Sequence, residues 1–444
     1  MTTNSYPQLA LVTDAIAAAL ENNLVAAKIC RWKPSTSKIN PLNGFKYIER
    51  VPPRYNTRTW NSTVATLAAG KQNTVFGAEI YALNSGITLD FGYEDFAHIR
   101  DEDMAARDDR LRMIGQNAGE HVDFDVLTKM MNAGNNWTFG TVGNAVDDIE
   151  ALINGYVRLK EEGVPDGEMF AVLPYSDLSP LSKYLVETVR AASDTQEAVL
   201  AKLGQSPRLK QLVGLNLLFT QQVPTFTTGT ASRANTLVNG ASQNVNYADV
   251  CQSTSTNGNF LTQTIAIDGL GAAATVKDGE VFTIDGVFAW DNRKGASKGR
   301  LQQFRVVGDF TANGSGEIAA LRIFPAIIVQ DSSSDIGTVG NNNANATVNA
   351  APANNAVITW VGAANTSYVI RSIVGRSVGH CEAADLEDLP SGENAKRQMK
   401  SVPMTLRAHR YSNGDTGATS VRFDAPYQFN LSPFGRFHSV RING

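Results

Sequence analysis

One tetrapeptide near the end of the chain, Asp415-Thr416-Gly417-Ala418, has the residue order of the catalytic sequence of aspartic proteases. In those enzymes two aspartates share one proton, because like charges at close range cannot both ionise. The catalytic sequence follows apolar strand residues, whereas Tyr411 to Gly414 precede it here, and this stretch has the composition of a hairpin turn. The pattern therefore favours a turn over a catalytic aspartate.

A second stretch, Ile265 to Ala274, imitates a dinucleotide-binding fingerprint, with Gly269, Gly271 and Ala274 at the required spacing after a strand pattern. A helix and then a parallel strand should follow a genuine fingerprint. Instead Asp278-Gly279 and another strand pattern arrive within about ten residues. We therefore predict that the chain binds no cofactor.

The residue types that bind metals are present without the usual spacing. None of the five histidines has ligand spacing with another, and His380-Cys381, the nearest to a metal pair, lacks a second cluster. The acidic residues Glu382, Asp385, Glu387 and Asp388 could bind a divalent cation, although a solvated charge run is the more common role. We predict no metal site and no catalytic residue.

Arginines and acidic residues form the remaining candidates, as contacts between subunits. Arg50, Arg54 and Arg58 lie in a polar loop and could pair with Asp101 or Asp103 of a neighbouring copy. Alternatively these charges only keep the loop soluble, and the sequence does not separate the two interpretations.

Composition limits the function classes. The 444 residues are enough for two or three cores, and the net charge of −4 gives no electrostatic footprint for strong nucleic-acid binding. No apolar run approaches the roughly 20 residues of a membrane span, and the first residues lack the basic region of a signal peptide. Three widely spaced cysteines argue against a disulfide framework. We expect a protein of a reducing cytoplasm with no membrane partner.

The elements that would position these residues are organised around a long helix, predicted over Asp101–Ala133. Its apolar stripe recurs at helical spacing, at Leu111, Ile114, Ala118, Val122, Val126 and Met130. Acidic residues at its start suit the helix dipole, and Gly134 ends it. Gly115 and Gly119 weaken the interior by about 1 kcal/mol each relative to alanine, so tertiary packing must support the helix.

Shorter elements flank this helix. We predict a helix over Leu9–Val25 and strands over Lys46–Val51, Thr57–Leu67 and Ile80–Phe91 before it. After it, the sequence predicts a helix from Asn144 to Gly163 whose apolar face includes Ile153 and Val157, and then an α+β region to about residue 227. Composition then shifts to threonine, asparagine and glycine. Four strand patterns follow, separated by turn signals such as Lys277-Asp278-Gly279, and predict a small all-β module.

This order of elements resembles the major capsid protein of tailed bacteriophages, and more closely the podovirus coat proteins with an insertion domain. Lys277 to Val287, KDGEVFTIDGV, resembles that domain's strand of the form Lys-Lys-Gly-Asp-x-Phe-x-Ile-x-Gly-Val, with Asp278-Gly279 in place of the Gly-Asp order. Asp95-Phe96 and the acidic cluster after them also lie where that family would place them.

The resemblance implies an α+β, HK-type capsid fold and a division of the chain. The division is an N-terminal arm (1–42), an extended loop (43–93), a spine helix (94–134), a peripheral and axial domain in two parts (135–227 and 341–444), and a β-rich insertion domain (228–340). It also implies a structural subunit, not an enzyme, that forms the pentamers and hexamers of an icosahedral head around double-stranded DNA. Assembly would occur in the bacterial host cytoplasm, through a procapsid built with a scaffolding protein. The portal protein and weakly bound DNA would be further partners.

Two other functions remain open. A protein compartment of the same fold that encloses enzymes is one, although the long β insertion counts against it. A ligand-binding protein that uses the β module is the other. Such a domain should have an aromatic-lined face, whereas Phe282, Phe288, Trp290 and Phe304 alternate in the manner of a core.

Overall fold

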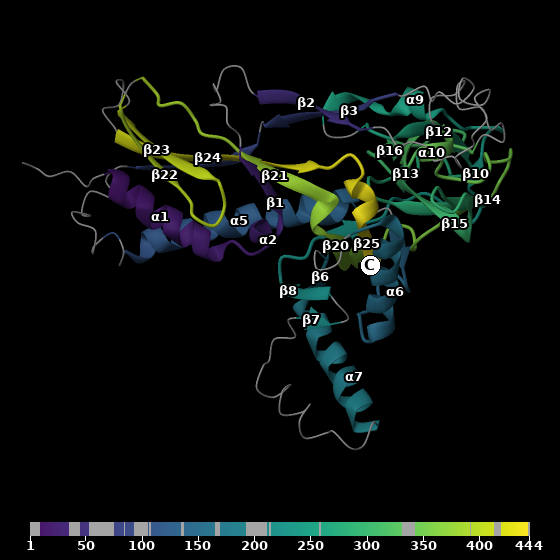
Figure 1. The fold of residues 1–444 in the computed structure, drawn as a ribbon, viewed down its shortest axis with the longest axis horizontal. Coiled ribbons are helices and arrows are strands. Elements are labelled where there is room, and N and C mark those ends of the chain that lie inside the picture. The colour runs from purple at the N-terminus through teal and green to yellow at the C-terminus, as the bar shows by residue number, and fades with distance from the viewer. Residues whose placement is uncertain are drawn as a thin grey trace, which may run out of the picture. The chain divides into compact units, whose positions relative to one another are not determined.

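The computed structural model describes most of the chain, in two compact units (Figure 1). The described residues are 9–34, 45–52, 75–83, 85–92, 105, 108–134, 137–164, 169–191, 211–212, 215–256, 259–330, 342–390, 392–412 and 419–442. Unit 1 comprises residues 1–47, 81–130 and 379–432, and unit 2 comprises 48–80, 131–378 and 433–444. Among the described helices, none is both long and apolar enough to span a membrane.

Unit 1 combines the helices α1, α2 and α5 with a six-stranded sheet. The strand order is β1-β21-β24-β23-β22, and β4 pairs with the first half of the long strand β24. The strands are β1 (Arg31–Pro34), β4 (Gly86–Gly92), β21 (Gly379–Ala383), β22 (Glu393–Gln398), β23 (Thr405–Ser412) and β24 (Thr419–Leu431). Since β1 pairs with β21 in parallel, segments from opposite ends of the chain form one sheet.

The long helix of unit 1, α5 (Asp109–Gly134), begins later than the Asp101 start that we predicted. Residues 101–104 lie outside the described residues, as does the predicted acidic start. The predicted stripe is confirmed, because five of its six residues are buried and Ile114 is half-buried. Helix α1 (Leu9–Asn23) confirms the predicted N-terminal helix, and α2 (Ala26–Ile29) follows it after a short turn.

The predicted strand Ile80–Phe91 is wrong in one respect, because two strands replace it. β3 (Gly77–Leu83) joins a three-stranded sheet of order β11-β3-β2, with β2 (Phe45–Val51) and β11 (Gln252–Thr256). β4 begins at Gly86 and belongs to the other sheet. A Cβ on Gly86 would lie 2.7 Å from the Ala425 carbonyl oxygen, so the chain needs a glycine where it enters the new sheet. The predicted strand Thr57–Leu67 lies outside the described residues.

Unit 2 contains a mixed sheet of order β5-β25-β20-β6-β8-β7. Its strands are β5 (Trp137–Phe139), β6 (Met169–Pro174), β7 (Gln211–Leu212), β8 (Leu215–Thr220), β20 (Ser372–Gly375) and β25 (Ser439–Ile442). Helix α6 (Ile149–Glu162) packs on β20 and β25, so closely that a Cβ on Gly155 would lie 2.7 Å from the Ile373 Cδ1 atom. The 3-10 turn η2 (Tyr175–Asp177) and helix α7 (Leu178–Ala191) follow β6.

Two details of α6 correct the prediction. The helix begins at Ile149 rather than Asn144, because Asp148 caps its start by accepting a 2.9 Å hydrogen bond from the Ala151 N–H. Ile153 and Val157, predicted on the buried face, are 39% and 47% exposed. Gly155 contributes to the buried face instead, and a hydrophobicity pattern does not register glycine. The end of the helix at Gly163, in the left-handed conformation, is as predicted.

The other large sheet of unit 2 has the order β10-β12-β17-β15-β14-β18, antiparallel throughout. Its strands are β10 (Leu237–Val238), β12 (Gln263–Asp268), β14 (Val281–Asp291), β15 (Ala296–Val306), β17 (Ile318–Phe324) and β18 (Ile358–Trp360). Shorter pairs accompany it: β13 (Thr275–Val276) with β16 (Phe310–Thr311), and β9 (Thr225–Thr227) with β19 (Ser367–Val369). The four predicted strands are present, and β18 extends this sheet beyond residue 340, where we placed the module's boundary.

The core of this antiparallel sheet is aromatic at its centre. Phe282 lies between Phe304 and Trp360, with ring centroids 5.8 and 5.0 Å away. Residues 342–355 contain the short helix α10 (Asn342–Asn345) and bury Val348 in the same core. The sheet therefore has a hydrophobic core of its own.

Candidate assembly surfaces

Of the predicted contact residues, the structure describes one. Arg50 lies exposed on β2, which is an outer strand of its three-stranded sheet. Arg54, Arg58, Asp101 and Asp103 lie outside the described residues. The structure therefore does not test the pairing of these arginines with the acidic residues.

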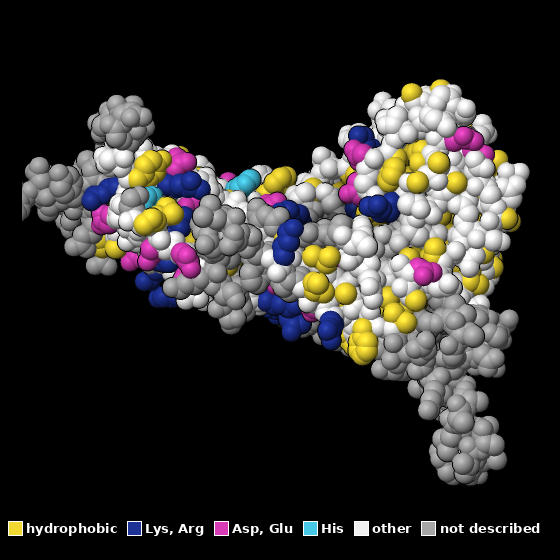
Figure 2. All heavy atoms as spheres, turned by 90° about the horizontal axis from the view of Figure 1, so that it is seen from above, with side chains coloured by type: hydrophobic (Ala, Val, Ile, Leu, Met, Phe, Trp, Pro, Cys, Tyr) yellow, Lys and Arg dark blue, Asp and Glu magenta, His cyan; other side chains and the backbone are white. Residues whose placement is uncertain are grey.

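Large apolar side chains are exposed on β2, just before β3 and on α5. Ile48 on β2 is 63% exposed and Phe76, just before β3, is 55% exposed. On α5, Met113 and Phe124 are 58% and 44% exposed, and their spacing of eleven residues places them on one face of the helix. Figure 2 shows one face of the molecule, on which the basic, acidic and hydrophobic side chains of the described residues are interspersed. Such surfaces fit contacts with other proteins better than contacts with nucleic acid.

Helix α1 is held on α5 by close backbone contact (Figure 1). A Cβ on Gly115 would lie 2.6 Å from both the Ala19 Cβ and the Ile16 carbonyl oxygen. A Cβ on Gly119 would lie 2.9 Å from the Leu20 carbonyl oxygen. The two glycines that weaken α5 locally are therefore the residues that let α1 approach it, a role that the sequence did not reveal.

Asp123 on α5 binds the backbone that follows α1. Its buried carboxylate accepts hydrogen bonds from the backbone N–H groups of Val25, Ala26 and Ala27, at 2.5, 3.0 and 2.9 Å. Burial raises the pKa of Asp123 even though these three hydrogen bonds act to lower it. The carboxylate thereby joins the turn between α1 and α2 to the middle of the long helix.

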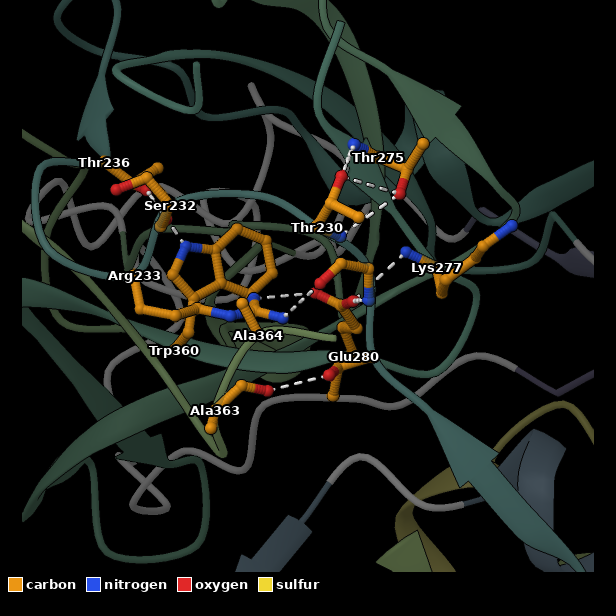
Figure 3. A network of polar contacts seen from close by, with 12 residues as sticks. Thr230, Ser232, Arg233, Thr236, Thr275, Lys277, Glu280, Trp360, Ala363 and Ala364 are labelled. Atoms are coloured by element: carbon orange, nitrogen blue, oxygen red, sulfur yellow. Dashed lines mark hydrogen bonds and ion pairs between the residues drawn. The ribbon is translucent and has the colours of Figure 1, made fainter. Parts of the chain in front are cut away.

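In unit 2, a buried carboxylate just before strand β14 binds a loop distant in sequence (Figure 3). Glu280 accepts hydrogen bonds from the Gly229 N–H, from the Lys277 N–H at 3.3 Å and from the Arg233 Nη1 at 2.8 Å. The guanidinium carbon of Arg233 lies 4.9 Å from the centre of the Trp360 ring. We did not predict this network, although Glu280 belongs to the KDGEVFTIDGV motif.

The same sheet contacts α6 through opposite charges, which we call the α6 clasp: Glu161, Glu162, Lys298 and Arg300. Lys298 Nζ lies 2.9 Å from Glu162 Oε1, and Arg300 pairs with Glu161. Carboxylates in the last turn of a helix oppose the helix dipole. The two cations from β15 compensate for this unfavourable placement, so the clasp couples the antiparallel sheet to the mixed sheet's helix.

The sequence patterns that imitated catalytic or cofactor sites lie in structural elements. Residues 413–418, with Asp415, lie outside the described residues, but the flanking strands β23 and β24 pair from Ser412 and Thr419 onward, as a hairpin requires. The fingerprint-like stretch begins within the antiparallel strand β12 and leads to β13, with no helix between these two strands. The structure therefore does not form the strand, turn and helix of a dinucleotide site there.

The candidate metal-binding residues engage in other contacts. His380 is buried on β21, with its Nε2 3.2 Å from Glu382 Oε1, and Asp385 and Asp388 both pair with Lys396, at 3.3 and 3.0 Å. Within the described part of the chain, no group of three or more potential ligands could hold a metal ion.

Comparison with known proteins finds only solved structures of low similarity to this chain. No protein-family model and no curated protein matches it. A structure from Mycobacterium phage Che8 is 9% identical and covers 90% of this chain and 84% of its own, with a TM-score of 0.36. The mature capsid of bacteriophage PhiM1 is 10% identical, with a TM-score of 0.37. The match covers 94% of this chain and 86% of the PhiM1 chain. The I-domain of the CUS-3 coat protein is 21% identical, covers 29% of this chain and 96% of its own, and has a TM-score of 0.20.

Proposed function

We propose that this chain is the major capsid subunit of a tailed bacteriophage, with an HK-type fold and an inserted β domain formed by the antiparallel sheet. It assembles with copies of itself into the pentamers and hexamers of an icosahedral shell around double-stranded DNA. It forms a procapsid with a scaffolding protein in the bacterial cytoplasm, and the shell expands when DNA enters. The proposal assigns the chain no catalytic activity.

The order of the elements carries this proposal. The elements follow the order of the family that the sequence resembles. They are a helix packed on a 26-residue helix, strands on either side of residues 53–74, and a mixed sheet followed by a separate antiparallel sheet. The KDGEVFTIDGV motif, which carried the resemblance, leads into strand β14 of that antiparallel sheet.

Exposed apolar side chains support assembly with further copies. Ile48 and Phe76 flank residues 53–74 in the sequence, and Met113 and Phe124 lie on one face of α5. Apolar and aromatic residues of this size are enriched in the buried centre of protein interfaces. In the proposed shell these residues are covered by neighbouring subunits, while Arg50, Arg54 and Arg58 pair with Asp101 or Asp103 of a neighbour.

Negative-stain electron microscopy of the purified chain, alone and with a candidate scaffolding protein, tests the proposal. Closed shells, curved sheets or aberrant particles are expected, because many modest contacts acting together produce a stable shell. Small discrete monomers or dimers under both conditions, at high protein concentration, would contradict it. If shells form in cells, nuclease-protected DNA inside them distinguishes a phage head from a compartment that encloses enzymes.

The predicted ion pairs have their own test, by exchange of charges. Arg50→Glu should reduce particle formation, and Asp101→Arg or Asp103→Arg in the same chain should restore it if the charges meet across an interface. Arg322→Glu, on an exposed position of β17, is the matched control and should assemble normally. Equal assembly of all variants would leave solubility as the role of Arg50.

A further inference from the structure

Two buried arginines of unit 2 lie close together, and among the described residues Asp278 is the carboxylate that interacts with them. Arg305 on β15 and Arg441 on β25 are each 4% exposed. Arg305 Nη2 lies 3.2 Å from both carboxylate oxygens of Asp278, which is half exposed. The Nε and Nη2 atoms of Arg441 and the Nε atom of Arg305 have no hydrogen-bond partner among the described residues. The pair therefore carries more positive charge than its surroundings neutralise.

The two guanidinium groups converge on one point, beside Gly279. A Cβ at Gly279 would lie 3.3 Å from Arg441 Nη2 and 3.6 Å from Arg305 Nη2. Gly279 has a positive φ of 93°, which side chains other than glycine rarely adopt. Phe226 closes one side, because the guanidinium carbon of Arg441 lies 4.8 Å from the centre of its ring. Guanidinium N–H groups from β15 and β25 thus surround the position of Gly279, where no side chain is present.

Charge reinforces this geometry. Burial and the neighbouring Arg305 lower the pKa of Arg441 to about 9, while Asp278 acts in the opposite direction. An uncompensated buried charge is strongly destabilising, whereas a guanidinium that donates to an oxyanion in two parallel bonds is stable. A second negative group at this position would therefore stabilise the fold.

We propose that Arg441 and Arg305 form a binding site for an oxyanion at the junction between β15 and β25, with Asp278 and Gly279 at its edge. The chemistry suits a phosphate or a carboxylate. The group comes either from a free anion in solution or from an aspartate or glutamate side chain of another copy of this chain. The second source rests on the proposed shell function, but the site itself does not.

Thermal unfolding of the full chain, in inorganic phosphate or in chloride at equal ionic strength, tests the site. A saturable rise of about 2 to 4 °C in the midpoint is expected in phosphate. Arg441→Met should abolish the rise, Arg441→Lys should weaken it because the planar fork is lost, and Arg322→Met, an exposed control on β17, should retain it. A rise that is equal in wild type and Arg441→Met overturns the proposal.

The same variants distinguish the two sources. If phosphate does not stabilise the dispersed wild-type chain but Arg441→Met and Arg441→Lys assemble less well than Arg322→Met, a carboxylate of another copy occupies the site. If wild type and both Arg441 variants agree in unfolding and in assembly, the site does not exist. Normal assembly of every variant, together with a phosphate effect confined to wild type, shows a free anion as the ligand.

Discussion

Unit 1 and the antiparallel sheet of unit 2 each hold a segment that is distant in sequence, and they do so by different means. In unit 1, α1 lies against α5 because Gly115 and Gly119 have no side chains, and the backbone of residues 25–27 donates to Asp123. In unit 2, the loop that contains Gly229 and Arg233 is bound by the buried Glu280, and β15 contacts α6 through the α6 clasp. The first contact depends on shape and the second on charge.

This difference determines what each region tolerates. A contact between backbones at van der Waals distance admits no added atoms, but salt changes it little. A network of ion pairs accommodates small changes of volume, but it depends on the charge of every member and weakens when one is removed. The two regions should therefore respond to opposite kinds of substitution.

The largest effect is expected where volume is added to the helix contact of unit 1. Gly115→Leu should lower the free energy of unfolding by about 3 kcal/mol, because the new side chain would overlap Ala19 and the Ile16 carbonyl. Urea denaturation followed by circular dichroism measures this. Asn117→Leu, exposed on the same helix, is the control and should be nearly neutral. Equal stability of the two variants would contradict the close contact.

Removal of charge should act most strongly on the network in unit 2. Glu280→Gln should cost about 2 kcal/mol of stability, because the half-buried Arg233 loses its anion and one buried acceptor oxygen is replaced by a donor. The measurement is again denaturation by urea, with Asp285→Asn, exposed on the strand β14 that follows Glu280, as the control. A neutral Glu280→Gln would show that the network adds nothing to the packing around Trp360.

The pH dependence of unit 1 should show opposite contributions from two carboxylates. Burial acts to raise the pKa of Asp424, but hydrogen bonds from Arg407, Arg422 and Thr88 outweigh it, so this pKa is lowered on folding. Its stabilising contribution is present above the unfolded pKa of about 4 and is lost as the pH falls through the lower folded pKa. Asp424→Asn should therefore lose less stability than wild type on acidification below about pH 4.

Asp123 should give the opposite pH dependence of stability to Asp424. Because its pKa is raised on folding, the stability linked to its protonation is largest below the unfolded pKa and declines as the pH rises through the folded pKa. Unfolding midpoints between acidic and neutral pH, measured for Asp123→Asn and Asp424→Asn, should shift in opposite directions relative to wild type. Parallel shifts would rule out this assignment.

The smallest effect is expected at the α6 clasp, whose ion pairs are partly exposed. Lys298→Glu should cost about 1 kcal/mol at low salt, and Glu162→Lys in the same chain should recover most of it. High salt should reduce the difference, because it screens charges at the surface. Denaturation at two ionic strengths checks this, and a loss that neither salt nor the second substitution changes would indicate packing instead of charge.

The sequence determined the local elements well, because their signals lie within a few residues. The apolar stripe of α5 predicted its buried face, Gly163 predicted the end of α6, and the strands and turns between residues 261 and 329 are present. The absence of a helix after Gly271 also followed from local turn signals. The α+β class follows from these elements, whereas the six-part division of the chain stays a prediction.

Only the tertiary structure decided how distant segments meet. Gly115 and Gly119 looked like weaknesses of a helix until α1 was seen to need their missing side chains. The stretch from Ile80 to Phe91 looked like one strand, because the pattern does not show that its halves pair with different partners. Asp123, Glu280 and Arg441 gave no signal, because a buried charge has a role only through the groups around it, and those groups lie many residues away in the chain.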